Sequence, residues 1–230
     1  MKPVLEVENL TFSFEQDQPC LRGISFRVFK GECLGIVGGN GAGKSTLLWC
    51  LLGFFKAGGS VRLFGEKIGK KALARVGMVF QNPEDQLFMP ALLDDVALPL
   101  VNRGMPIGEA RAIGLEKLDL MGLRHLANRP ATRLSIGERK RASIAAALAT
   151  APELLMLDEP TAELDGRSVR QLTNVLVQLD LTRIVTSHHL DFLRNISSRA
   201  LVLCEGRIVA DGPMALILHD RALIRAANLE

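Results

Sequence analysis

The sequence predicts an α/β fold with a parallel sheet at its centre, on the basis of two observations. Short apolar runs, of the kind that form strands buried on both faces, alternate with segments of helical pattern. Four such runs end at residues able to act on a phosphate: a glycine-rich loop after Val37, then Gln81, Asp158 and His188. Ligands of parallel α/β sheets lie beyond the carboxyl ends of the strands, so we expect these residues to share one site.

The N-terminal part of the chain has a different pattern, which is typical of antiparallel strands. Polarity alternates from Val4 to Phe14 and from Ile24 to Phe29, and a polar link joins the two runs. Val61 to Ile68 predicts a further hairpin strand between flanking glycines. Residues of about 1–31 and 58–70 are therefore expected to form an antiparallel β subdomain.

From Asn82 to about Ala149 the pattern becomes helical and is interrupted by prolines, which predicts an inserted helical subdomain over residues 82–149. The remaining residues are assigned to the core of a single domain of 230 residues. The elements expected in this core are a buried strand at Leu154–Leu157, a helix at Val169–Leu179, a strand at Arg183–Thr186, a hairpin around Glu205-Gly206 and a helix at Met214–Ala227.

The glycine-rich loop carries the strongest chemical signal, because it fits the phosphate-binding pattern G-x-x-x-x-G-K-[ST] between a strand-like run and a predicted helix. Its glycines let the backbone turn N–H groups towards an anion, and the following helix adds the positive end of its dipole. Lys44 supplies a charge for the β- and γ-phosphates, and the Ser45 hydroxyl is placed to bind Mg²⁺. The expected nucleotide contacts are Gly38, Gly39, Asn40, Gly41, Ala42, Gly43, Lys44, Ser45 and Thr46.

Two carboxylates directly follow the buried apolar run at residues 154–157. Asp158 is a hard oxygen ligand suited to Mg²⁺, and Glu159 is then placed to polarise the attacking water as the catalytic base. The alternative interpretation, acidic caps at a helix start before Pro160, explains one carboxylate better than it explains a pair.

A helix start is predicted at Ser135, where Ser135 and Glu138 fit a capping box ahead of an alanine-rich segment that reaches Ala149. A capped helix start with Gly137 nearby is also a good anion site. The local pattern does not choose between these two interpretations.

Composition and charge limit the classes of function. The net charge is +3, from 28 basic and 25 acidic residues, which is too balanced to indicate nucleic-acid binding by bulk electrostatics. The four cysteines lack C-x-x-C spacing, which favours a reduced, cytosolic setting. The most apolar stretch, from Ile144 to Leu157, is too short to span a bilayer, so any membrane role is expected to go through a partner.

Taken together, these motifs resemble the ATP-binding cassette (ABC) family over nearly all of the chain, which implies a P-loop NTPase (RecA-like) core. Phe14 stands where this family places an aromatic ring that stacks on adenine. The matching segments are Gly38–Thr46 for the Walker A motif, Gln81 for the Q-loop, Leu134–Glu138 for the signature motif, Leu154–Glu159 for the Walker B strand, Ala162–Asp165 for the D-loop and His188 for the switch histidine.

The resemblance implies a mechanism with ATP and Mg²⁺ as cofactors. Lys44, Glu159 and His188 are the implied catalytic residues, and Ser45, Gln81 and Asp158 are the implied metal ligands. It also implies a head-to-tail dimer, with a second copy or with a paralogue. In that dimer Ser135, Gly137 and Glu138 contact the nucleotide of the partner subunit, and Asp165 belongs to the nucleotide site.

Some positions depart from the family pattern. Ile136 replaces the usual first glycine of the signature motif, and Glu138 replaces the usual glutamine. A β-branched side chain at position 136 would be strained if that position needed φ > 0. Gly39 stands where proline or serine is more common, and His189 stands where an aspartate is common.

The segment from Val79 to Phe88 resembles a particular branch of the family, the energy-coupling-factor importers, which take up vitamins such as biotin or nickel and cobalt ions. Asp95–Ala97 fits the same branch, and Asp220–Leu223 looks more like its nickel/cobalt members. The branch implies an integral membrane coupling subunit and a substrate-binding membrane subunit as partners, no nucleic acid, and a peripheral location on the cytoplasmic face of the cell membrane.

A different class is the alternative: a soluble ABC ATPase that acts on nucleic acid or on ribosomes. Such proteins usually carry two cassettes, a long coiled coil or zinc-binding inserts. The sequence has none of these and no basic arm.

Overall fold

The computed structural model describes residues 2–15 and 18–227. The chain forms two compact units, one made of residues 1–74 with 180–230 and the other of residues 75–179. The predicted α/β class is confirmed, since both parallel and antiparallel strands occur together with helices. The division into a β subdomain, a helical subdomain and a core stays a prediction.

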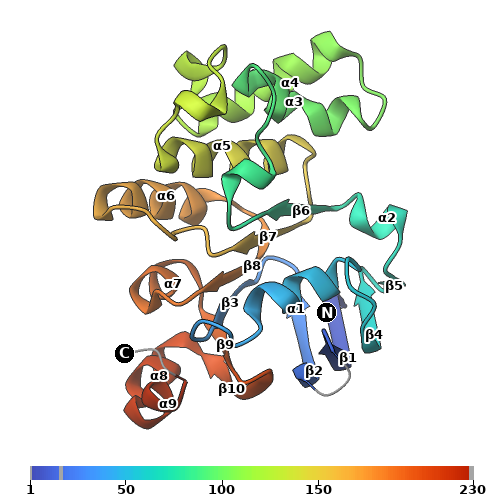
Figure 1. Cartoon of the computed structure of the whole chain (residues 1–230), viewed down its shortest axis with the longest axis vertical. Helices are drawn as coiled ribbons and strands as arrows, with labels where there is room; N and C mark the ends of the chain where they lie inside the picture. The colour runs from blue at the N-terminus through green and yellow to red at the C-terminus, as the bar shows by residue number, and fades with distance from the viewer. Residues whose placement is uncertain (1, 16–17, 228–230) are drawn as a thin grey trace. The chain divides into compact units, whose positions relative to one another are not determined.

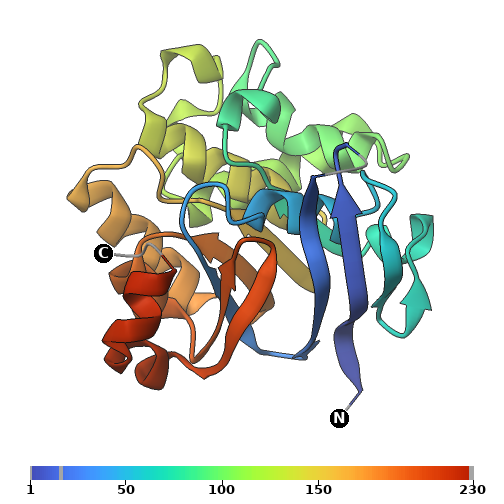
Figure 2. The same cartoon turned by 60° about the horizontal axis from the view of Figure 1, so that its bottom comes forward.

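The first unit contains a four-stranded antiparallel sheet in the order β2-β1-β4-β5. Its strands are β1 (Pro3–Ser13), β2 (Pro19–Phe29), β4 (Gly58–Leu63) and β5 (Glu66–Lys67). The two long strands lie side by side in Figure 2, and β2 alternates between buried and exposed residues from Ile24 onwards, as a sheet with one covered face requires. The single strand predicted over residues 61–68 is wrong in detail: the chain turns at Phe64 and Gly65, both at positive φ, and forms β4 and β5.

Parallel strands form the buried centre of the first unit. Strand β3 (Cys33–Val37) pairs in parallel with β8 (Thr182–Ser187) and with β9 (Arg199–Cys204), and β10 (Arg207–Pro213) is antiparallel to β9. Every residue of β3 and of β8 is buried. This explains the continuous apolar run in β3, whereas β8 also buries the polar residues Thr182, Arg183, Thr186 and Ser187. The register pairs Val37 with Ser187, so the residues that follow β3 and β8 leave the same edge.

The helices of the first unit are short: α1 (Lys44–Leu51), α2 (Lys70–Leu73), α7 (Leu190–Ile196), α8 (Met214–His219) and α9 (Arg221–Ala226). The single helix expected over residues 214–227 is two helices, because the chain breaks at Asp220 and the side chain of Asp220 accepts a hydrogen bond from the N–H of Leu223 to start α9.

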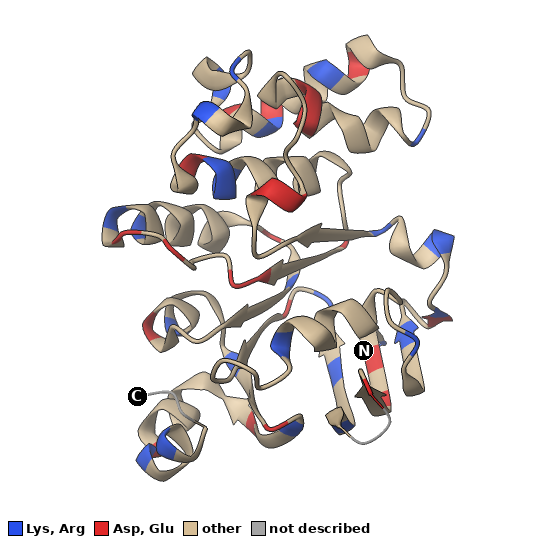
Figure 3. Ribbon diagram, viewed as in Figure 1, with Lys and Arg blue, Asp and Glu red and all other residues tan. Residues whose placement is uncertain are grey.

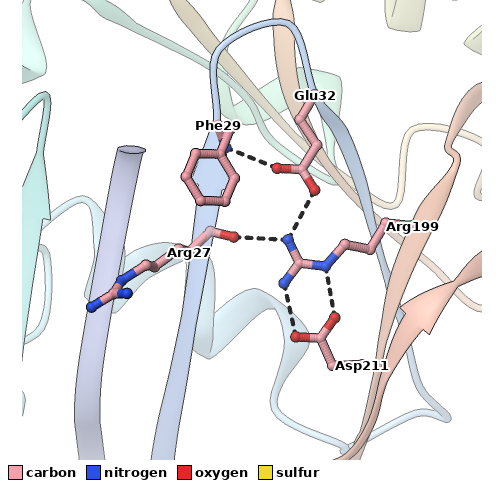
Figure 4. Close-up of polar contacts among 5 residues, drawn as sticks. All are labelled: Arg27, Phe29, Glu32, Arg199 and Asp211. Atoms are coloured by element: carbon pink, nitrogen blue, oxygen red, sulfur yellow. Dashed lines mark hydrogen bonds and ion pairs between the residues drawn. The ribbon is translucent and has the colours of Figure 1, made fainter. Parts of the chain in front are cut away.

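Arg199 of β9 connects three segments of the first unit (Figure 4). Its guanidinium donates to both carboxylate oxygens of Asp211 at 2.7 and 2.8 Å, and to a carboxylate oxygen of Glu32 and the carbonyl of Arg27, each at 2.9 Å. The second oxygen of Glu32 accepts from the N–H of Phe29 at 2.8 Å. The hydrogen bonds that Arg199 donates to Asp211 raise the pKa of Arg199 above its ordinary value, so the guanidinium stays charged.

The second unit combines a strand pair with helices (Figure 1). Strand β6 (Val76–Val79) is parallel to β7 (Leu154–Asp158), and Val79 pairs with Leu157. The helices are α3 (Leu92–Val101), α4 (Ile107–Leu120), α5 (Ile136–Ala149) and α6 (Gly166–Gln178), with 3₁₀ turns at Pro83–Asp85, Arg124–Leu126 and Ala131–Arg133. The buried strand predicted at residues 154–157 is confirmed as β7.

Charged residues of both signs are interspersed along both units in Figure 3, in line with the small net charge of +3. Among the described residues, no helix is both long enough and apolar enough to cross a membrane.

Candidate active site

The glycine-rich loop of the first unit follows β3 directly and runs into α1. Gly41 and Gly43 have φ of 78° and 102°, a left-handed backbone that side-chain-bearing residues rarely adopt. A Cβ on Gly43 would also lie 3.1 Å from Leu21 and 3.3 Å from the carbonyl of Cys20. Conformation and close packing both require glycine at position 43, which fixes the loop at the start of α1.

Lys44 is the first residue of α1 and is only 6% exposed. Its ammonium donates to the carbonyls of Gly38 and Gly39, at 2.7 and 3.1 Å. The loop therefore curls around this ammonium, which places a fixed positive charge beside the backbone N–H groups at the helix start. That combination suits an anion such as a phosphate.

Phe14 projects from the end of β1 and is 64% exposed. A pocket of about 440 Å³ lies beside it and is lined by Phe14, Gln18, Pro19, Cys20 and Arg22. The Phe14 ring is packed edge to face against Phe12 and Phe55, with centroids 4.9 and 5.5 Å away. Phe12 and Phe55 are stacked on one another. An exposed, supported aromatic ring beside a pocket is suited to stacking on a flat ligand.

His188 directly follows β8, at the sheet edge from which the glycine-rich loop also leaves, because Val37 pairs with Ser187. Its ring lies 4.1 Å from the ring of His189, centroid to centroid, and both side chains are exposed. Within the first unit, the structure therefore brings the predicted phosphate loop and the predicted switch histidine to one edge.

The second unit repeats this arrangement with β6 and β7. Since Val79 pairs with Leu157, Gln81 and the two carboxylates leave the same edge of the strand pair. Asp158 and Glu159 are 2% and 5% exposed. Glu159 has φ of 41°, in the left-handed region, and such strained backbone is concentrated at functional sites.

The signature segment lies at the start of α5, and the predicted capping box is confirmed. The N–H of Glu138 donates to the Ser135 hydroxyl at 3.3 Å, and the carboxylate of Glu138 accepts from the N–H of Ser135 at 2.8 Å. This backbone hydrogen bond lowers the pKa of Glu138. Ile136 has a negative φ, so it is not strained at the position where the family usually has glycine.

Gly137 of the signature segment and Asp165 of the D-loop both have structural roles inside the second unit. A Cβ on Gly137 would lie 2.8 Å from the hydroxyl of Ser168 on α6, so glycine lets the two helices approach. Asp165 caps α6 by accepting from the N–H of Ser168 at 2.7 Å, and this bond lowers the pKa of Asp165. Its assignment to a nucleotide site stays a prediction.

Sequence reasoning missed Lys140, which is only 2% exposed on α5. Its ammonium donates to the carbonyl of Gln81 at 2.5 Å and to that of Glu159 at 3.3 Å. Burial lowers its pKa, while the charges of Glu163, Asp158 and Glu159 oppose that shift. The signal was present in the sequence: Gly137, Lys140 and Ile144 follow one another at helical spacing and all three are buried on one face of α5.

The predicted residues divide between the two units. The phosphate loop, Phe14 and His188 belong to the first unit, and Gln81, Asp158, Glu159 and the signature segment belong to the second. In the first unit the phosphate loop and His188 follow paired parallel strands. In the second unit Gln81, Asp158 and Glu159 lie at the ends of a strand pair, and the signature segment lies at the start of α5.

Comparison with known proteins agrees with these features. The ABC transporter family model matches residues 21–162. The energy-coupling factor transporter ATP-binding protein EcfA of Methanothermobacter thermautotrophicus is 38% identical over 98% of this chain and 76% of its own length. The structure of CbiO1 from Clostridium perfringens, part of the ABC transporter complex CbiONQ, is 32% identical, with a TM-score of 0.85 over 100% of this chain and 96% of that one. A dimeric cassette, MJ0796 bound to ADP and Pi, has 26% identity and a TM-score of 0.81 over 91% of this chain and 98% of that one.

A chain with this fold, this phosphate loop and these relatives belongs to the ABC transporter family, as an ATP-binding ATPase subunit. Within the family it is of the energy-coupling-factor type, the type represented by EcfA and CbiO1.

Proposed function

We propose that this chain is the ATP-hydrolysing subunit of an energy-coupling-factor importer that drives uptake of a cobalt or nickel ion, or of a vitamin such as biotin, through a membrane partner. One observation supports the ATPase chemistry most strongly: each unit places its predicted phosphate-acting residues directly after paired parallel strands. The resemblance of Asp220–Leu223 to the nickel/cobalt members of this branch favours a transition-metal ion as the substrate.

Binding of ATP is assigned to the first unit. The glycine-rich loop wraps the β- and γ-phosphates with its N–H groups, and the ammonium of Lys44 neutralises part of their charge. The adenine ring stacks on the exposed face of Phe14, which Phe12 and Phe55 hold in place.

The residues proposed to hold Mg²⁺ fit that ion in the chemistry of their donors. Ser45 offers a hydroxyl, Gln81 an amide oxygen and Asp158 a carboxylate, and Mg²⁺ prefers hard oxygen ligands with few carboxylates and with substrate phosphates completing its shell. When bound, the ion would neutralise charge on the β- and γ-phosphate oxygens.

Hydrolysis is assigned to Glu159 and His188. Glu159 accepts a proton from the attacking water, or orients that water, in line with the γ-phosphate. The nearly complete burial of Glu159 keeps bulk water away from the carboxylate. His188 contacts the γ-phosphate at the edge where the phosphate loop also begins.

A dimer completes the proposed site. The start of α5, with Ser135, Gly137 and Glu138, would meet the γ-phosphate held by the partner subunit, because the 14-residue helix α5 directs its positive end towards an anion. MJ0796, the relative bound to ADP and Pi, is a dimer. The second subunit of this dimer is either another copy of this chain or a paralogue.

The membrane partners are proposed to be an integral coupling subunit and a substrate-binding subunit, with this chain held peripherally at the cytoplasmic face. CbiO1 is part of a complex with other subunits, and that relationship supports the assignment.

Uptake measurements in the native host test the proposal. Deletion of the gene should abolish uptake of labelled cobalt, nickel or biotin, and wild-type sequence should restore it while Glu159→Gln should not. Unchanged uptake of all three labels, together with recovery of ribosomal or DNA-bound proteins with a tagged chain, would contradict the importer and favour the soluble alternative.

A further inference from the structure

Lys140 is a buried cation that the proposed chemistry does not use. It lies on α5, five residues after the cap residue Ser135, and its ammonium has two carbonyl acceptors in the same unit. Removing an ammonium from water is costly unless it is well bonded. A methionine would fill similar space without that cost, but it would supply neither of the two hydrogen bonds.

The two acceptors belong to residues with proposed roles in hydrolysis. One is the carbonyl of Gln81, and the other is the carbonyl of Glu159. The Glu159 carbonyl also accepts from the N–H of Ala162 at 3.1 Å. These two bonds hold the main chain of Glu159 in its left-handed conformation, which a non-glycine residue adopts only when the surroundings enforce it.

The same helix carries the signature residues at its start. Helix α5 is continuous from Ile136 to Ala149, so Ser135 and Lys140 are joined by little more than one rigid turn. A pocket of about 290 Å³ is lined by residues of this helix and of the segment after β6, among them Gln81 and Lys140, and by Glu163. Lys140 therefore joins the signature helix to the two strand-end segments beside this pocket.

We propose that Lys140 is a positioning residue that couples the signature helix to Gln81 and to the base Glu159. The inference rests on the proposed function. In the head-to-tail dimer, the start of α5 contacts the nucleotide bound by the partner subunit, while Glu159 and Gln81 act on the nucleotide bound by their own chain. When α5 shifts on contact with the γ-phosphate bound by the partner subunit, the Lys140 ammonium moves with the helix and displaces the carbonyls of Gln81 and Glu159. Binding of one nucleotide at the signature helix thereby positions Glu159 for hydrolysis of the other nucleotide.

Two substitutions and a matched control test this role. Lys140→Met removes the donor while keeping the length of the side chain, and Lys140→Arg keeps a donor. Arg139→Met is the control, because Arg139 is the adjacent cation on α5 and bonds at 2.8 Å to the exposed carboxylate of Glu84, with no bond recorded to Gln81 or Glu159 in the described residues.

The measurements are single-turnover ATP hydrolysis, the Kd for a fluorescent ATP analogue and the Tm of each purified variant. We expect Lys140→Met to lower the hydrolysis rate by about tenfold or more, since small misplacement of a catalytic group is costly, with the Kd within about twofold of wild type. Lys140→Arg should recover most of the rate, and Arg139→Met should keep it within about twofold.

Hydrogen exchange supplies a readout independent of activity. In Lys140→Met the N–H of Ala162 should lose protection, because its acceptor, the Glu159 carbonyl, is no longer held by the lysine. Lys140→Arg should keep that protection.

Three results would overturn the inference: a normal rate in Lys140→Met, equal losses in Lys140→Met and Lys140→Arg, or a rate loss that only follows a parallel loss of Tm and ATP affinity. A wild-type chain that binds ATP but never hydrolyses it would instead contradict the proposed function itself.

Discussion

The ring of Phe55 lies edge to face against the ring of Phe14, with the centroids 5.5 Å apart and the planes at 79°. Phe55 is in turn 5.3 Å from the ring of Trp49 on α1, the helix that begins with Lys44. The exposed ring proposed to stack on adenine is thus supported by residues on and just after the helix that starts at the phosphate loop.

Phe55→Leu should weaken ATP affinity by about two- to tenfold, because an aromatic pair contributes about 0.5–1.5 kcal/mol and its loss frees the Phe14 ring. Calorimetric titration with ATP measures the change. The neighbouring Phe54→Leu is the control, since Phe54 is 63% exposed and has no recorded ring contact in the described part of the chain, so its affinity should match wild type. Equal effects of the two substitutions would contradict the supporting role of Phe55.

Arg199→Ala should lower the free energy of unfolding by about 1–3 kcal/mol, because it leaves the half-buried carboxylate of Glu32 and the carbonyl of Arg27 without their charged donor. Urea denaturation measures this. Arg199→Lys should recover only part of the loss, since an ammonium cannot form the two-pronged bond to Asp211 seen in Figure 4. Full recovery by lysine would show that charge alone, not the planar geometry, holds the cluster.

The capping box predicts a pH dependence of stability. The hydrogen bond from the N–H of Ser135 lowers the pKa of Glu138 in the folded chain, so the carboxylate stabilises the fold fully above its unfolded pKa of about 4.3. That contribution is lost as pH falls through the lower folded pKa. The difference in unfolding free energy between wild type and Glu138→Ala should therefore be constant near neutral pH and shrink in acid. A difference that grows in acid would contradict this account.

The parts of the structure that local chemistry determines could be predicted from the sequence. The glycine-rich loop, the capping box of Ser135 and Glu138, and the buried strand β7 depend on neighbouring residues, so their patterns are visible in the chain. The same is true of the strand ends, since paired parallel strands must deliver their following residues to one edge.

Other features depend on contacts between segments that are distant in the sequence, so they could not be predicted from local patterns. The helical spacing of Lys140 with Gly137 and Ile144 indicates which face of α5 it occupies, but no local pattern identifies the carbonyls of Gln81 and Glu159 as its acceptors. The packing of Gly137 against Ser168 likewise depends on the close approach of α5 and α6. The break at Asp220 is a local capping signal that the helical pattern of the tail obscured.

The central claim is that Glu159 is the base of an ATP-driven dimer, and the most direct test is ATP hydrolysis and oligomeric state of Glu159→Gln measured side by side. We expect this variant to bind ATP, to lose turnover by about a hundredfold or more, and to accumulate as an ATP-bound dimer by light scattering. Lys44→Ala, the control, should lose ATP binding and remain monomeric with nucleotide present. Wild-type turnover in Glu159→Gln would contradict the account.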